Sequence, residues 1–287
     1  MDSNSSSVFQ QLKEEKFFFK KNLGQNFIFD KNLLISMVLD SGITSDDVVI
    51  EIGAGAGTLT EQLAKVAKKV ISFEIDKNLS SVLSKVEERH ENLSIVFKDI
   101  LKVDLTQFIP PNQKFKVVAN LPYYITTPIM FYFLEKSELA SITVMVQKEV
   151  AERFCANKNS SNYGAVTAQL AYYSTPKITR IVSKKLFNPE PKVDSAIVRL
   201  DIEKKSGVEN PKTLKKVIAA SFAMRRKTLS NNLVAAFSFS KEMSEKILAS
   251  CNIAVNARGE TLDIFDFIKL SNEIENLGNT LIPRIEN

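Results

Sequence analysis

The sequence has little histidine and little cysteine, the residue types on which many catalytic and metal sites depend. Its 287 residues include one histidine and two cysteines. His90 lies in a charged run typical of a solvated helix end, so we do not expect histidine chemistry. Cys155 and Cys251 lie far apart without metal-ligand spacing, which argues against a disulfide scaffold and a zinc site. We therefore expect a protein without a metal, in a reducing compartment.

Long apolar runs are also missing. No run approaches the roughly 20 residues of a membrane-spanning helix, and the polar N-terminus lacks the basic region and apolar core of a signal peptide. We expect a cytoplasmic protein that does not enter a membrane, and nothing in the sequence requires more than a monomer.

Lysine and arginine number 38 against 33 aspartates and glutamates, and the formal net charge of +5 permits a nucleic-acid partner without demonstrating one.

The order of the elements predicts an α/β protein. Helical stretches, such as 59–66 and 79–88, separate short apolar runs from residue 48 onward. This alternation predicts a mostly parallel, seven-stranded sheet covered on both faces. The predicted strands are 48–52, 70–75, 93–97, 115–119, 141–146, 177–182 and 196–202.

The composition also divides the chain into three parts. Residues 1–20 are predicted to form a flexible arm, whose cluster Phe17 to Phe19 docks on the body. Residues 21–203 form the α/β domain, and residues 204–287 a helical C-terminal domain. The polar stretch 203–211, which carries glycine and proline, is the predicted linker between them.

A glycine-rich turn and two acids predict an adenosine site. The motif Glu51 to Gly57 follows a strand and opens a helix, and Gly53 and Gly55 allow a ligand to approach the main chain. Its GxGxG spacing weakens the interpretation as a pyrophosphate site. Glu74 ends the next strand, where it can accept both ribose hydroxyl protons, and Asp99 ends the third, where it can accept from an adenine amine. Ligands in such sheets bind at the carboxyl ends of the strands, so these residues can meet one adenosine.

The most informative segment is Asn120-Leu121-Pro122-Tyr123-Tyr124, at the end of the fourth predicted strand. Methylating an adenine amine requires acceptors for its two hydrogens, because its lone pair is delocalised into the ring. The Asn120 side-chain oxygen and the Leu121 carbonyl can supply them, while Pro122 stiffens the turn. Tyr123 can stack on a flipped base, an interaction worth roughly 1–3 kcal/mol. A sulfonium donor is already activated, so no histidine base is needed.

These motifs resemble the ribosomal RNA adenine N6,N6-dimethyltransferases, and above all the bacterial branch that acts on the small subunit. The similarity extends over nearly the whole chain. The matching segments are Asn22 to Phe27, Glu51 to Gly57, Glu74 to Asp76, Asp99, Asn120 to Ile125, Val146 to Val150, Tyr163-Gly164, Phe187 to Ala196 and Phe222 to Leu233.

The resemblance implies a Rossmann-like class I methyltransferase fold, with S-adenosylmethionine as cofactor and an all-α domain that binds RNA. It also implies dimethylation of two adjacent adenosines near the 3′ end of 16S rRNA, within the 30S subunit during its late biogenesis. Phe187 matches the aromatic residue that helps to sandwich the target adenine. Position 28 is commonly leucine in the family, a small departure here. The positions that match the family's cofactor contacts are Asn26, Ile28, Gly53, Glu74, Asp99 and Asn120.

Three alternatives stay open. The related enzymes that dimethylate 23S rRNA share the fold and the Asn-x-Pro-Tyr motif, although Arg225 to Leu233 favours the small-subunit branch by resemblance. A mainly non-catalytic assembly factor that binds RNA is a second possibility, and DNA adenine methylation a weaker third. Arg225, Arg226 and Lys227 begin a helix-like stretch, where they contact RNA phosphates, pack between domains or form a solvated face. Lys20, Lys21 and Lys148 are weaker basic candidates.

Overall fold

The computed structural model describes residues 25–281, with side chains described up to residue 277. The predicted arm at residues 1–20, with Lys20, and Lys21 beyond it lie outside the described residues. The chain forms two compact units. The first contains the residues up to Ala151 together with Lys177–Ile202, and the second contains Glu152–Pro176 and the residues from Glu203 onward. The boundary after Ile202 lies beside the predicted one, whereas the place of Glu152–Pro176 in the second unit was not predicted.

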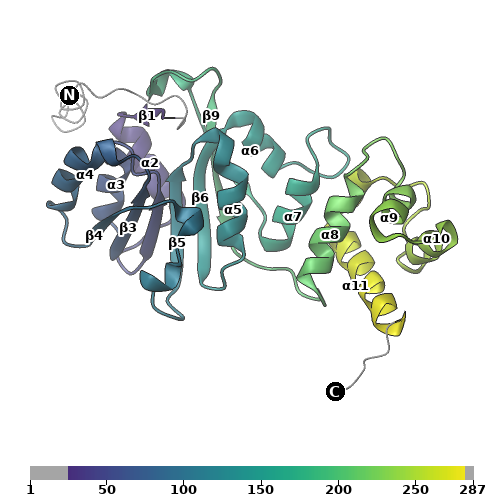
Figure 1. The fold of residues 1–287 in the computed structure, drawn as a ribbon. Coiled ribbons are helices and arrows are strands. Elements are labelled where there is room, and N and C mark those ends of the chain that lie inside the picture. Colours follow the sequence, from purple (N-terminus) through teal and green to yellow (C-terminus); the bar gives the residue numbers. More distant parts are fainter. Residues whose placement is uncertain (1–24, 282–287) are drawn as a thin grey trace. The chain divides into compact units, whose positions relative to one another are not determined.

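The first unit is built on a seven-stranded sheet with the order β4-β3-β2-β5-β6-β9-β7 (Figure 1). Strands β2 to β6 run parallel, and β9 runs antiparallel to both β6 and β7. The predicted mostly parallel, seven-stranded sheet is therefore confirmed. The strands are β2 (Val48–Ile52), β3 (Lys69–Glu74), β4 (Leu93–Phe97), β5 (Phe115–Asn120), β6 (Leu139–Gln147), β7 (Lys177–Val182) and β9 (Ser195–Asp201).

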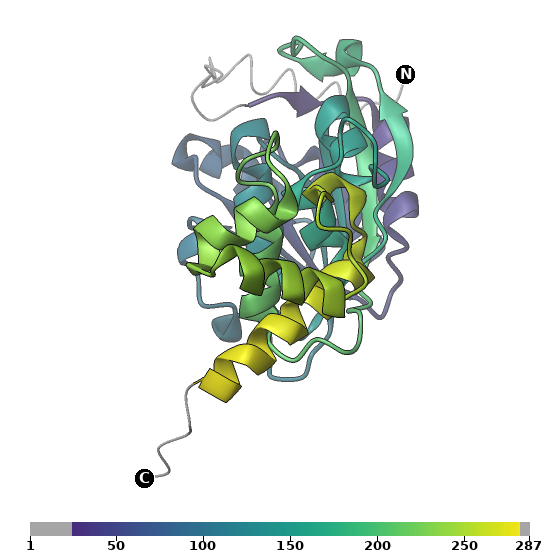
Figure 2. The same cartoon turned by 90° about the vertical axis from the view of Figure 1, so that its right-hand side faces the viewer.

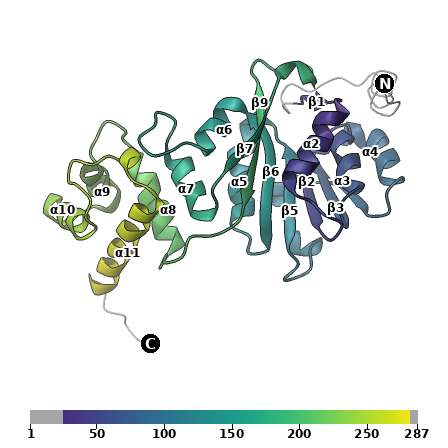
Figure 3. The same ribbon diagram turned by 180° about the vertical axis from the view of Figure 1, so that it is seen from behind.

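Helices cover both faces of this sheet, which explains why its central strands are continuous apolar runs. All five residues of β2 are buried. Helices α2 (Lys31–Ser41), α3 (Thr58–Ala64) and α4 (Ser80–Glu87) share one core cluster with the sheet. Figures 1 and 3 show α5 (Thr126–Leu134) on the face opposite to α2.

A second, two-stranded sheet joins segments that are distant in the sequence. Strand β1 (Phe27–Ile28) pairs antiparallel with β8 (Phe187–Asn188), so that Ile28 lies opposite Phe187. This pairing was not predicted from the sequence. It holds the segment before α2 against the segment before β9.

The described residues of the second unit form helices and turns and contain no strand. Asn210 caps α8 by accepting from the Lys212 amide, and Pro211 stands at the first helical position, where its missing N–H costs nothing. Figure 2 shows α8 to α11 in green and yellow. After α6 (Lys148–Phe154), which leads from the first unit into the second, the helices are α7 (Ala165–Tyr173), α8 (Pro211–Ser221), α9 (Leu229–Phe237), α10 (Lys241–Ser250) and α11 (Ile264–Leu281).

Candidate active site

The glycine-rich turn joins β2 to α3 and needs glycine for its backbone. Gly53 and Gly55 have φ values of 78° and 55°, in the left-handed region that disfavours side chains. A Cβ on Gly55 would also lie 3.1 Å from the Phe27 ring. The amide of Gly53 donates to the Phe73 carbonyl at 2.8 Å, which fastens the turn to β3. The turn therefore exposes main chain, rather than side chains, at this edge of the sheet.

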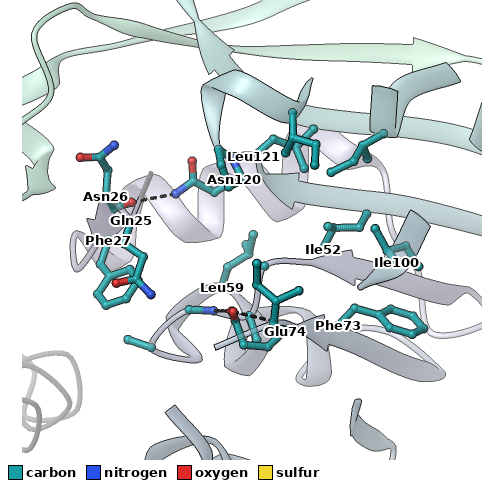
Figure 4. Close-up of a pocket in the computed structure, with 18 of the residues that line it drawn as sticks. Gln25, Asn26, Phe27, Ile52, Leu59, Phe73, Glu74, Ile100, Asn120 and Leu121 are labelled. Atoms are coloured by element: carbon teal, nitrogen blue, oxygen red, sulfur yellow. Dashed lines mark hydrogen bonds between the residues drawn. The ribbon is translucent and has the colours of Figure 1, made fainter. Parts of the chain in front are cut away.

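Glu74 connects this turn to the end of β3. Its Oε2 accepts from the Gly55 amide at 2.8 Å (Figure 4). Its Oε1 accepts from the Ile75 and Asp76 amides at 2.8 and 2.9 Å. The side chain is buried. Each carboxylate oxygen can accept more than one hydrogen bond, so the oriented carboxylate can also accept from ribose hydroxyls.

A second acid, Glu51, lies behind the turn in the middle of β2. It is fully buried, and its Oε2 accepts from the Ser72 hydroxyl at 2.6 Å. Burial raises the pKa of Glu51 to about 7, the bond from Ser72 opposes this rise, and the charge of Glu74 adds to it. In the sequence, Glu51 is marked only as the first residue of the glycine-rich motif.

Asn120 ends β5, and its amide group has a defined orientation. Its Nδ2 donates to the main-chain carbonyl of Asn26 at 3.1 Å (Figure 4). The adjacent Leu121 is anchored to β6, because its amide donates to the Met145 carbonyl at 3.3 Å. With Nδ2 engaged by Asn26, the side-chain oxygen of Asn120 is the atom that can accept from a ligand.

Two tyrosines follow in a short 3₁₀ turn, Tyr123–Ile125, and they differ in exposure. Tyr123 is half-buried, and its hydroxyl lies 3.0 Å from the Ser195 hydroxyl. Burial raises the pKa of Tyr123, so its phenol is neutral at pH 7. Tyr124 is 60% exposed. The first ring is thus held in place, and the second projects toward solvent.

One pocket at the carboxyl ends of β2, β3, β4 and β5 contains most of the predicted site residues. Those that line it are Asn26, Ile28, Gly53, Gly55, Glu74, Asp99, Asn120, Leu121, Pro122 and Tyr123. The remaining lining residues were not assigned to the site from the sequence, although eight of them lie inside the segments that match the family. These remaining residues are Gln25, Phe27, Leu34, Ile52, Ala54, Ala56, Thr58, Leu59, Phe73, Ile75, Lys98, Ile100, Tyr124, Ile125 and Ile129.

Four predicted site residues lie elsewhere. Phe187 is 5% exposed and packs in the core cluster that also contains Ile28, outside the lining of this pocket. Arg225, Arg226 and Lys227 belong to the second unit and are exposed. They form a turn between α8 and α9 rather than the start of a helix, because Thr228 caps α9.

The residues present fit an adenosine-containing cofactor. Gly53 and Gly55 line the pocket without side chains, and the Glu74 carboxylate is already oriented. Asp99 is held by the Leu101 amide at 3.1 Å, yet its side chain is 39% exposed and can accept from an adenine amine.

The described residues contain no cluster of three potential metal ligands. Nor is any helix among them long and apolar enough to cross a membrane.

Known proteins match this chain over most of its length. A family model for ribosomal RNA adenine dimethylase matches residues 16–270. Ribosomal RNA small subunit methyltransferase A of Streptococcus gordonii is 44% identical over 277 residues, which cover 93% of this chain and 96% of that protein.

Two solved structures of related enzymes also match this chain over most of its length. A dimethyladenosine transferase from Plasmodium falciparum is 29% identical with a TM-score of 0.75, and the match covers 86% of this chain and 96% of that one. The 23S rRNA methyltransferase ErmE is 25% identical with a TM-score of 0.67, and the match covers 87% of this chain and 100% of that one.

Proposed function

This chain belongs to the ribosomal RNA adenine dimethylase family and uses S-adenosylmethionine, and we propose that it dimethylates two adjacent adenosines near the 3′ end of 16S rRNA. The fold alone does not select this substrate, because the 23S rRNA methyltransferase ErmE shares it. The choice is supported by the small-subunit methyltransferases, to which the chain is more similar in sequence. We place the enzyme in the cytoplasm as a monomer, acting on 30S particles late in their assembly.

The orientation of the Asn120 side chain is the observation that best supports the proposed methyl transfer. Because its Nδ2 donates to the Asn26 carbonyl, its oxygen is available to one N6 hydrogen, and the Leu121 carbonyl can accept the other. Both acceptors localise the lone pair on the nitrogen. When bound, S-adenosylmethionine supplies a methyl group that its positively charged sulfur already activates. Alignment of the amine with that methyl group then provides much of the catalysis.

The other pocket residues position the two adenosines. Glu74 and Asp99 hold the ribose and the adenine of the cofactor at the ends of β3 and β4. Tyr123 stacks on the target base once this base has left its helix. We assign RNA contacts outside the pocket to the second unit, including the exposed Arg225, Arg226 and Lys227. The role of Phe187 beside the target adenine stays a prediction.

Substitution of Asn120 tests the catalytic role. We expect Asn120→Ala to abolish methyl transfer while particle binding stays largely intact, because the change removes one acceptor from the pocket and no exposed basic residue. Transfer of labelled methyl groups and co-sedimentation with 30S particles measure the two properties separately. Undiminished turnover by this variant would refute the acceptor role.

Three purified substrates test the proposed target. We expect methylation of undermethylated 30S particles, with mass spectrometry locating two adjacent dimethyladenosines near the 3′ end of their 16S rRNA. Methylation of protein-free 23S rRNA and of duplex DNA should be absent. Activity on 23S rRNA alone would overturn the assignment, and particle binding without transfer would indicate an assembly factor.

A further inference from the structure

A hydrogen bond joins the pocket residue Tyr123 to Ser195, which lies outside the pocket lining. The Tyr123 hydroxyl lies 3.0 Å from the Ser195 hydroxyl, although the residues are 72 positions apart. Tyr123 follows β5, and Ser195 begins β9, and both strands flank β6 in the sheet. The tyrosine side chain therefore reaches across the end of β6 to its partner.

Ser195 offers a rigid anchor for this bond. It is fully buried, and it lies in register with Gln147 of β6 on one side and with Val182 of β7 on the other. The preceding residue, Asp194, is held twice: its carbonyl accepts from the Lys148 amide, and its Oδ1 accepts from the Lys184 amide, both at 3.0 Å. The sheet therefore determines where the Ser195 hydroxyl lies.

The turn that carries Tyr123 is less firmly held. It spans three residues and follows Pro122, which has no amide hydrogen to donate. The turn closes through the Pro122 carbonyl, which accepts from the Ile125 amide at 3.2 Å and from the Thr126 hydroxyl at 3.3 Å. A tyrosine ring rotates about two side-chain bonds, so a bond at its hydroxyl restrains both rotations.

We propose that Ser195 is a positioning residue for the target base, because it holds the Tyr123 ring in the plane in which an adenine stacks. This inference rests on the proposed function, in which Tyr123 stacks on the target base. Ser195 itself does not line the pocket. Its loss should therefore affect turnover of the RNA and leave cofactor affinity unchanged.

Ser195→Ala, Tyr123→Phe and the double variant test this role. Each single change removes one partner of the hydrogen bond, and Tyr123→Phe keeps the ring. We expect either one to lower kcat on undermethylated 30S particles by about five- to tenfold, the effect of one lost hydrogen bond. KM for the particles and the affinity for S-adenosylmethionine should change less than twofold. The double variant should be no slower than the single variants, because the bond is lost only once.

Thr143→Val is the matched control. It removes a buried hydroxyl on the adjacent strand β6 that makes no hydrogen bond with the described residues, so kcat should stay within twofold of the parent protein. The inference is overturned if Ser195→Ala retains full kcat while the parent protein is active, or if the two single effects multiply in the double variant. It is also overturned if Ser195→Ala weakens binding of S-adenosylmethionine. A parent protein that does not methylate the particles would instead refute the proposed function.

Discussion

Replacing Glu51 with glutamine is expected to stabilise the protein above pH 7. Glu51 is fully buried in β2, and its Oε2 accepts from the Ser72 hydroxyl at 2.6 Å. Burial raises its pKa from 4.5 to about 7, so the folded state holds this proton more tightly than the unfolded chain does. A glutamine has nearly the same shape, can accept from Ser72 and carries no charge at any pH.

The rise in pKa determines the expected size of the effect. At about 1.4 kcal/mol per pH unit, the difference between 4.5 and about 7 corresponds to about 3 kcal/mol. This stability is fully present below the unfolded pKa of Glu51 and is lost as pH rises to about 7. The glutamine at position 51 of the variant has no titrating group. Its free energy of unfolding should therefore exceed that of the parent protein by about 3 kcal/mol more at pH 8 than at pH 4.5.

Urea unfolding between pH 4.5 and pH 8 measures this difference. Because the chain forms two compact units, circular dichroism should be combined with hydrogen exchange of peptides from Val48–Ile52, which report on the sheet unit. Glu88→Gln, an exposed change in the same unit, is the matched control and should show no such trend. If the difference in the free energy of unfolding between Glu51→Gln and the parent protein is independent of pH, the fold does not raise the pKa of Glu51.

Two further changes test the cofactor pocket, with affinity for S-adenosylmethionine measured by titration calorimetry. Gly55→Ala forces a side chain into a backbone with φ of 55° and places its Cβ 3.1 Å from Phe27, so affinity should fall at least about tenfold. Gly164→Ala is the control, because a Cβ there would meet nothing within 4 Å, and it should leave the affinity unchanged. An equal loss of affinity in this control would show that the loss at Gly55 does not come from its place in the pocket. Glu74→Gln replaces one acceptor oxygen with a donor and deprives a main-chain amide of its partner. Affinity should then fall by about ten- to a hundredfold, whereas unchanged binding would exclude Glu74 from the site.

The strands of the sheet could be predicted closely because buried strands appear in the sequence as short apolar runs. The bounds of β2, β4 and β7 agree with the predicted ranges residue for residue. The pairing of β1 with β8 could not be predicted in this way. Each has two residues, too few for a periodic pattern, and the partners are far apart in the sequence.

The same distinction applies to the site. The strand-end residues Gly53, Glu74, Asp99 and Asn120 were predicted to meet, since parallel strands place their carboxyl ends at one edge, and the structure brings them together in one pocket. The location of Phe187 depends on its pairing with β1, which only the fold reveals.

The orientation of Asn120 shows why a short motif does not by itself determine the geometry of a site. The group that orients its amide is the main-chain carbonyl of Asn26, in the segment next to β1. Every residue has such a carbonyl, so this partner leaves no mark in the sequence. The pairing of Phe27 with Asn188 then holds that segment in place. The direction of the Asn120 side-chain oxygen therefore depends on three parts of the chain: the end of β5, the segment before β1, and β8.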